Sequence, residues 1–159
     1  MKILDLVDDV RSGCKSVLTT MTLEEYKKLS FFAFNNNGNI DGQRSVIKRS
    51  STAAKIRKRM ADDFRKGAIF PQVVLGVLFS TENMQNLDES KFYMLLESVN
   101  EGQISIIDGM QRSNIYFENY EDNKQQKIRV EFWCSDASTK LLYRMLVLNT
   151  GQVPWNTRR

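Results

Sequence analysis

The chain has 159 residues, 42% of them hydrophobic and 26% charged, with a formal net charge of +4, which is typical of one globular domain with a sizeable core. No apolar stretch is long enough to cross a bilayer, and acids interrupt the apolar start of the chain, which excludes a secretory signal peptide. The absence of histidine excludes Ser-His-Asp and Cys-His catalysis and histidine-ligated zinc.

The first 39 residues show four local patterns, and we expect them to form an N-terminal extension packed on the rest of the domain. The opening apolar residues have helical spacing and predict a short helix: Ile3, Leu6, Val7 and Val10. Residues 16–21 then predict a strand, and residues 22–25 (Thr-Leu-Glu-Glu) have the pattern of a capping box that opens a helix to about Leu29. An Asn-rich loop follows at residues 35–39.

The middle of the chain predicts a helix and then a buried strand. The helix runs from a cap at residues 50–52 to about Lys66, where Gly67 stops it. Its buried stripe would consist of Ala53, Ile56, Met60 and Phe64. The continuous apolar run of residues 73–79 is typical of a strand that is covered on both faces.

The rest of the chain alternates predicted helices and strands. These are a helix from Asp88 or Ser90 to Gly102, a strand-turn-helix unit at residues 104–118, a strand at residues 128–132, and a helix from Asp136 or Ser138 to residues 149–151. The order predicts an α/β (α+β) fold with a small mixed sheet flanked by helices, in a single domain over residues 1–159.

The strand-turn-helix unit contains the clearest candidate site. Its turn at Asp108-Gly109 places the N-terminus of a helix after a buried strand, where unsatisfied N–H groups and the helix dipole favour an anion. Arg112 falls in the first helical turn, which costs about 0.3–1 kcal/mol unless a bound phosphate reverses the interaction. The alternative is that Asp108 caps the helix and pairs with Arg112, with no ligand.

Positive charge is concentrated between residues 44 and 66. That segment has nine basic residues against only Asp62 and Asp63, a net +7 in a chain whose total is +4, so the remainder has a net charge of −3. This concentration indicates contact with a polyanion such as DNA, and the alternative is a solvated helix face. The candidate nucleic-acid-binding residues are Lys48, Arg49, Lys55, Lys58, Arg59, Arg65 and Lys66.

Four short motifs occur in a fixed order, and together they support a resemblance. They are Gln43-Arg44, Gly67 to Pro71 followed by Val73-Val74-Leu75, Asp108-Gly109-Met110-Gln111-Arg112, and Leu148-Asn149-Thr150-Gly151. This set, over about residues 40–159, resembles the ParB/sulfiredoxin-like superfamily. Within that superfamily it is most similar to the DGQHR and DGQQR domains of DndB-like proteins and type IV restriction proteins.

The resemblance implies a cytoplasmic protein of a DNA-directed system such as restriction or phage defence. ParB-like members bind and hydrolyse CTP, DGQQR members are linked to nucleotide hydrolysis that licenses a nuclease domain, and DndB-like members are DNA-binding regulators of DNA modification. Carried over, the resemblance predicts a nucleoside triphosphate with Mg²⁺ as the ligand. The predicted nucleotide-binding residues are Gln43, Arg44, Gly109, Met110, Arg112 and Asn149.

Two residues of the motif are candidates for catalysis. Asp108 could coordinate Mg²⁺ or orient a water, and Gln111 could position that water for a slow, Mg²⁺-dependent hydrolysis. Met110 departs from the family, which more often has Gln there, and this puts hydrolysis in more doubt than binding. Gln111 and Asn149 can equally be satisfied polar groups beside the turn.

Other interpretations stay open. The chain could be a non-catalytic DNA-binding or regulatory module that uses residues 44–66, or a partner-binding domain that kept the fold and lost the activity. Nuclease chemistry is less favoured, because Glu101 and Asp108 are too far apart along one strand to share a metal ion. Larger relatives continue into a helical or nuclease region, so we expect a truncation or a minimal member, with a homodimer as a further option.

Overall fold

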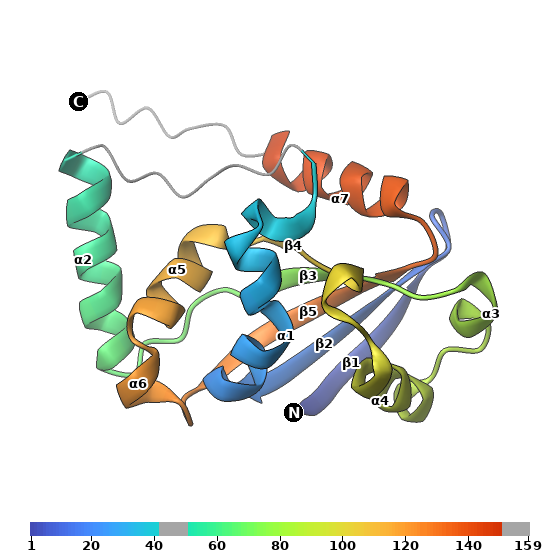
Figure 1. Cartoon of the computed structure of the whole chain (residues 1–159), viewed down its shortest axis with the longest axis horizontal. Coiled ribbons are helices and arrows are strands. Elements are labelled where there is room, and N and C mark those ends of the chain that lie inside the picture. The colour runs from blue at the N-terminus through green and yellow to red at the C-terminus, as the bar shows by residue number, and fades with distance from the viewer. Residues whose placement is uncertain (42–50, 151–159) are drawn as a thin grey trace.

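A five-stranded mixed sheet forms the centre of the computed structural model, which describes residues 1–41 and 51–150, without the side chains of the last two (Figure 1). Its strand order is β1-β2-β5-β3-β4, and all neighbours are antiparallel except β3 and β5, which are parallel. The predicted class, a small mixed sheet flanked by helices, is confirmed. The strands are β1 (Lys2–Asp9), β2 (Cys14–Thr22), β3 (Val73–Leu78), β4 (Ile104–Asp108) and β5 (Lys127–Ser135).

Helices cover both faces of this sheet. On one face the main core is formed with α1 (Leu23–Asn35), α4 (Glu89–Ser98) and α5 (Met110–Glu118), and on the other a smaller core is formed with α7 (Ser138–Thr150). Figure 1 shows α2 (Ser51–Arg65) at the side of the molecule, beside α5. The short elements are η1 (Asn37–Asn39), α3 (Thr81–Met84), η2 (Glu101–Gln103) and α6 (Tyr120–Asn123).

The prediction of a helix over residues 3–10 is wrong, because this segment forms the strand β1 as far as Asp9. A β-bulge between Ile3 and Asp5 shifts the register of β1 against β2. Ile3 and Leu6 therefore both pack toward the main core although they are three residues apart, a spacing that imitates a helix. Val7 and Val10, the other two apolar residues of the pattern, are exposed.

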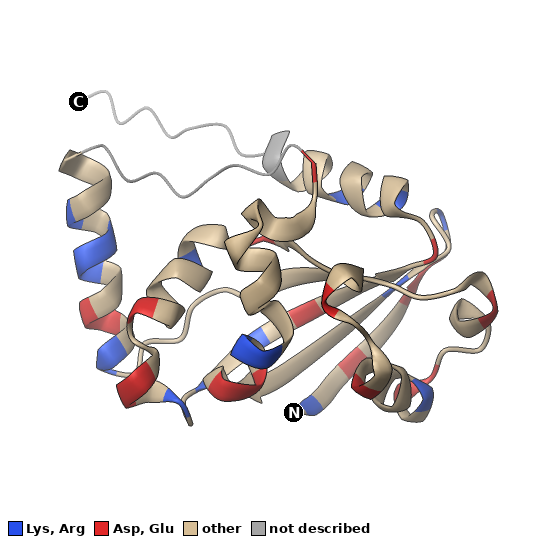
Figure 2. Ribbon diagram, in the orientation of Figure 1, with Lys and Arg blue, Asp and Glu red and all other residues tan. Residues whose placement is uncertain are grey.

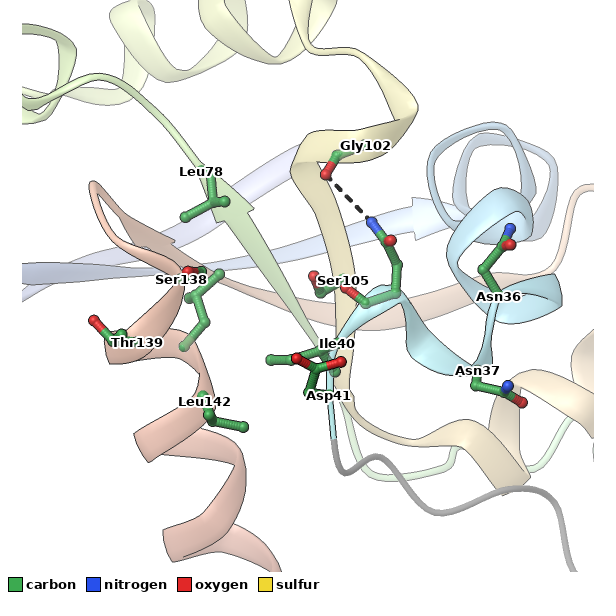
Figure 3. A pocket seen from close by; sticks show the side chains of 12 residues that line it. Asn36, Asn37, Ile40, Asp41, Leu78, Gly102, Ser105, Ser138, Thr139 and Leu142 are labelled. Atoms are coloured by element: carbon green, nitrogen blue, oxygen red, sulfur yellow. Dashed lines mark hydrogen bonds between the residues drawn. The ribbon is translucent and has the colours of Figure 1, made fainter.

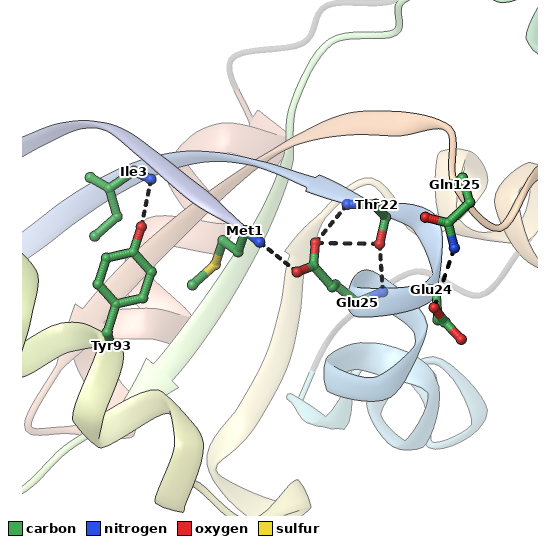
Figure 4. Close-up of polar contacts among 7 residues, drawn as sticks. All are labelled: Met1, Ile3, Thr22, Glu24, Glu25, Tyr93 and Gln125. Atoms are coloured by element: carbon green, nitrogen blue, oxygen red, sulfur yellow. Dashed lines mark hydrogen bonds and ion pairs between the residues drawn. The ribbon is translucent and has the colours of Figure 1, made fainter.

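The capping box at the start of α1 is confirmed (Figure 4). The hydroxyl of Thr22 accepts from the Glu25 amide at 3.2 Å, and the Glu25 carboxylate accepts from the Thr22 amide at 2.8 Å. The same carboxylate forms an ion pair with the amino group of Met1. The helix extends six residues past the predicted end at Leu29, to Asn35, because Phe31, Phe34 and Tyr26 pack with Phe117 of α5.

The predicted strand at residues 73–79 is confirmed as β3, which is buried on both faces along Val73–Val77. The predicted stripe of α2 is wrong in part. Phe64 is its buried residue, Ala53 and Met60 are half-buried, and Ile56 is 55% exposed. Within residues 1–41 and 51–150, no helix combines the length and apolar character needed to span a bilayer.

Candidate functional site

The predicted strand-turn-helix unit is present, and its turn requires glycine. Asp108 ends β4, Gly109 is the N-cap of α5 with φ of +108°, and α5 begins at Met110. A Cβ atom on Gly109 would lie 3.0 Å from both γ-methyl carbons of Val73. The turn therefore combines a left-handed backbone with close contact to β3, and it brings the start of α5 directly onto the end of the sheet.

Arg112 is held at this turn by two acceptors. Its Nη2 donates to Asp108 Oδ2 at 2.7 Å and to the carbonyl oxygen of Gln72 at 3.2 Å. Its Nε is buried and has no acceptor among the described residues. The ligand-free interpretation expected Asp108 to pair with Arg112 and to cap the helix. The ion pair is present, but Asp108 does not cap α5, which begins without a side-chain cap.

A buried hydroxyl relay fixes the turn from the side of α1. Ser113 donates through Oγ to the Gly109 carbonyl at 2.9 Å, so Tyr26 must donate its phenol proton to Ser113 Oγ at 2.6 Å. Burial raises the pKa of Tyr26 to about 12 and also raises the pKa of Tyr116, and Arg112 opposes both shifts. No pattern in the sequence singles out Tyr26 or Ser113, because their contact depends on how α1 crosses α5.

The other predicted nucleotide-site residues are placed less completely. Met110 is buried at 7% exposure, and Gln111 is half-buried on the first turn of α5. Asn149 lies in α7, but its side chain is not described. Gln43, Arg44, Lys48 and Arg49 lie outside the described residues. The structure therefore brings together Asp108, Gly109 and Arg112. It does not show whether Gln43, Arg44 and the side chain of Asn149 lie beside them.

The basic residues of α2 form one exposed face, which we call the basic face. Lys55, Lys58 and Arg59 are exposed, with Lys55 three and four residues before the other two, and the exposed Lys66 comes directly after the end of the helix. Asp62 lies on the same face, but it forms an ion pair with Arg65, which also donates to Asn119 Oδ1 at 2.7 Å. Figure 2 shows this run of basic residues along α2.

One aromatic anchor attaches α2 to the body. Phe64 lies on the opposite side of the helix from the basic face, with ring centroids 5.0 Å from Tyr116 and 5.9 Å from Phe70. Gly67, with φ of +88°, ends the helix, as predicted. Because Phe64 packs on the body from the side of α2 opposite the basic face, the basic face points outward from the molecule.

A separate cavity of about 850 Å³ lies between η1 and the first turn of α7 (Figure 3). Its described lining contains one carboxylate, Asp41, and no Lys or Arg. Such a lining suits a neutral hydroxylated molecule better than a phosphate. The polar side chains of its lining are Asn36, Asn37, Asn39, Asp41, Ser105, Ser138 and Thr139.

Metal chemistry has little support in the part of the chain that the structure describes. No group of three or more Cys, Asp or Glu side chains there could hold a metal ion. Asp108 is the candidate ligand from the sequence, and it is paired with Arg112. Any Mg²⁺ at this turn would therefore need phosphate oxygens as further ligands.

No family model, curated protein or solved structure matches this chain. The ParB-like resemblance accordingly stays a prediction that depends on the four motifs alone. Of these motifs, the described structure includes the turn at Asp108 and the strand that follows Pro71.

Proposed function

We propose that this chain binds nucleic acid through the basic face of α2. The observation that carries the proposal is the position of Lys55, Lys58 and Arg59 on a helix that is buried only at Phe64, with Lys66 directly after its end. These cations span about three helical turns, roughly 16 Å, and a DNA strand presents a phosphate about every 3.4 Å. A projecting α-helix also has the width that the major groove of B-DNA admits.

Ion pairing with DNA makes the binding sensitive to salt. Each phosphate that a cation neutralises releases counterions, so the logarithm of the binding constant falls by about 0.9 per phosphate for each unit of log salt. Phosphate contacts carry no sequence information, and we expect weak discrimination between DNA sequences.

The test measures binding of a labelled duplex by fluorescence anisotropy over a series of salt concentrations. Replacing Lys55, Lys58 and Arg59 with Gln should weaken binding at least tenfold and reduce the salt slope by about 2–3. The charge-matched control replaces Lys2, Lys28 and Lys127, which are exposed on other elements, with Gln. Equal losses in both triple variants would show that only net charge matters and would contradict the proposal.

A second candidate is a nucleotide-phosphate site at the turn between β4 and α5. It is favoured by Arg112, whose Nε has no acceptor among the described residues and whose side chain lies in the first turn of a helix. In this candidate, amides after Gly109 and the free edge of Arg112 hold a phosphate. Asp108 would release Arg112 and take Mg²⁺, and Gln111 would position a water for slow hydrolysis of the triphosphate.

Isothermal titration with ATP, CTP and GTP, each with Mg²⁺, tests this candidate. The expected result is binding of at least one nucleotide that is lost in Arg112→Ala and kept in Arg129→Ala, a matched change on the exposed part of β5. Since Arg112→Ala also breaks the ion pair with Asp108, its thermal unfolding is measured beside it. Failure of all three nucleotides would exclude the site in this chain without affecting the DNA proposal.

We further propose that the wider context is the one the resemblance implies. In that context the chain is a ParB-like, cytoplasmic component of restriction or phage defence, which acts with a nuclease or helical region or as a homodimer. The two candidate sites can serve together, since Phe64 of α2 packs on Tyr116 of α5, one turn after Arg112. Absence of both DNA and nucleotide binding would leave the partner-binding interpretation.

A further inference from the structure

Another positively charged site, away from α2, lies between the β1–β2 hairpin and α7. A cavity of about 270 Å³ opens there. Figure 1 shows the hairpin tip on the opposite side of the molecule from α2. The lining residues that carry the argument are Asp9, Arg11, Trp133, Lys140, Tyr143 and Arg144.

Two arginines in this cavity are stacked on aromatic rings. The guanidinium carbon of Arg144 lies 4.3 Å from the centroid of the Trp133 ring, and that of Arg11 lies 4.8 Å from the centroid of the Tyr143 ring. Arg11 also donates to the Tyr143 hydroxyl at 3.1 Å. A guanidinium that lies over an aromatic ring keeps N–H donors that can bind an oxyanion, because the face of the ring offers them no oxygen acceptor.

The guanidinium of Arg144 is under-satisfied. Its Nε is buried and has no acceptor among the described residues, and a buried donor without an acceptor is costly. Arg144 also forms no ion pair within the part of the chain that the structure describes. Because its Nε is buried, a ligand in the cavity would meet the terminal Nη atoms of Arg144, which form no ion pair among the described residues.

The local charge favours a ligand with a single negative charge. Lys140 is neutralised by its 2.8 Å ion pair with Asp136, and Asp9 partly offsets the two stacked arginines. Three cations against two acids leave a net charge of +1. A carboxylate balances that charge, whereas a phosphate monoester exceeds it and would be repelled by Asp9.

The surroundings favour a carboxylate that belongs to a protein. Val10 at the hairpin tip is 91% exposed, and Tyr143 beside it is 50% exposed. Tyr, Trp and Arg are enriched among the residues that contribute most to binding in protein interfaces, and this cavity contains all three. A nucleic-acid backbone would leave Val10 and Tyr143 uncovered.

We propose that this cavity, which we call the stacked-arginine site, binds a Glu or Asp side chain of a partner protein, next to an apolar residue that covers Val10 and Tyr143. This site does not depend on the proposed function. It lies away from α2, so a partner can bind while the basic face contacts nucleic acid.

The probe is acetyl-leucyl-glutamyl amide, titrated into the ¹⁵N-labelled chain and followed by NMR. The expected result is a saturable shift of the Arg144 Nε–H and Trp133 indole N–H resonances. The matched control peptide carries Gln in place of Glu and should cause no such shift, because it lacks the charge. A phosphoseryl peptide is the third probe and separates carboxylate from phosphate recognition.

Variants locate the binding. Arg11→Gln and Arg144→Gln should each weaken binding of the glutamyl peptide about tenfold, which corresponds to one charge-assisted pair. Arg129→Gln, an equal change on β5 outside this cavity, should leave it unchanged. Arg11 is exposed on the hairpin, so its variant tests the site even where Arg144→Gln fails to fold. Equal shifts with the Gln peptide, preference for the phosphoseryl peptide, or full binding by both arginine variants would each overturn the proposal.

Discussion

Gly109 connects the end of the sheet to the candidate phosphate site, and two different constraints act on it. Its φ of +108° is disfavoured for any residue with a Cβ, and the position of that Cβ is occupied by Val73. Gly67, which ends α2, has a similar φ of +88° but nothing within 4 Å of its Cβ position. Comparing an alanine substitution at Gly67 with one at Gly109 therefore distinguishes the cost of backbone strain from the cost of steric contact.

Gly67→Ala should lower the free energy of unfolding by about 1–2 kcal/mol, from backbone strain alone. Gly109→Ala should cost about 1–2 kcal/mol more, because the methyl group also displaces Val73. Urea denaturation of both variants measures the difference. In the Val73→Ala background, Gly109→Ala should lower the free energy of unfolding by less than it does in the parent, whereas the cost of Gly67→Ala should be the same in both. Equal losses in the two single glycine variants would contradict the contact with Val73.

The buried phenol of Tyr26 predicts a dependence of stability on alkaline pH. In the unfolded chain a tyrosine loses its proton near its ordinary pKa of 10.0, whereas the folded state keeps it to about 12. Between these values the unfolded state binds fewer protons, so the free energy of unfolding falls as pH rises, by roughly 3 kcal/mol from this group.

Tyr26→Phe should remove that part of the slope, and it should also cost about 1 kcal/mol at neutral pH through the lost hydrogen bond to Ser113. Denaturation curves from about pH 9 upward measure both effects. A slope that is unchanged in Tyr26→Phe would show that the phenol titrates alike in the folded and unfolded states.

For individual residues, the sequence was enough to predict contacts between residues that are close in the chain, but not contacts between residues that are far apart in it. Asp108 and Arg112 are four residues apart, on either side of the turn between β4 and α5, so their ion pair could be predicted from the local sequence. Tyr26 and Ser113 are 87 residues apart, and their hydrogen bond depends on the packing of α1 against α5. Nothing in the local sequence at either residue carries that information.

Among the elements, α1 was predicted from chemistry that is complete within four residues. Thr22 and Glu25 satisfy each other's amides whatever the rest of the chain does. Thr22→Ala should therefore cost about 1 kcal/mol of unfolding free energy, and Thr22→Ser should stay close to the parent because it keeps the acceptor. Thermal denaturation of the three proteins decides this, and an equal loss in Thr22→Ser would mean that the methyl group matters and the cap does not.

The strand β1 was mispredicted because of its bulge. Strands are recognised by alternation of apolar and polar residues, and one extra residue breaks that alternation. Ile3 and Leu6 then face the same core at a separation of three residues. Pairing with β2 decides the conformation, and this pairing is a property of two segments that local spacing cannot show.

For the whole molecule, the contrast between β3 and α2 predicts a gradient of local stability. The strand β3 is paired on both sides and buried on both faces, whereas α2 is anchored at Phe64. Amide hydrogens of Val73–Leu78 should exchange only on global unfolding, and those in the first half of α2 should exchange much faster. Hydrogen exchange measured by mass spectrometry tests this, and comparable protection in both segments would argue that α2 has a firmer attachment.

The sequence indicated the mixed sheet but not its strand order. Every strand except β1 was predicted from its own apolar pattern, as with residues 73–79, and an alternation of strands and helices implies layers. That β5 lies between β2 and β3 follows from long-range pairing, for example of Val17 with Phe132 and of Leu75 with the same residue. Neither local propensity nor spacing encodes such a choice.

The central position of β5 has a consequence for synthesis on the ribosome. The β1–β2 hairpin and the β3–β4 pair share no strand, and the segment that joins them, Lys127–Ser135, is translated after both. Until then the inner edges of β2 and β3 are unpaired, and unpaired edges add strands from other chains. A growing chain that stalls before residue 135 is therefore a template for aggregation, and a single late segment closes both edges at once.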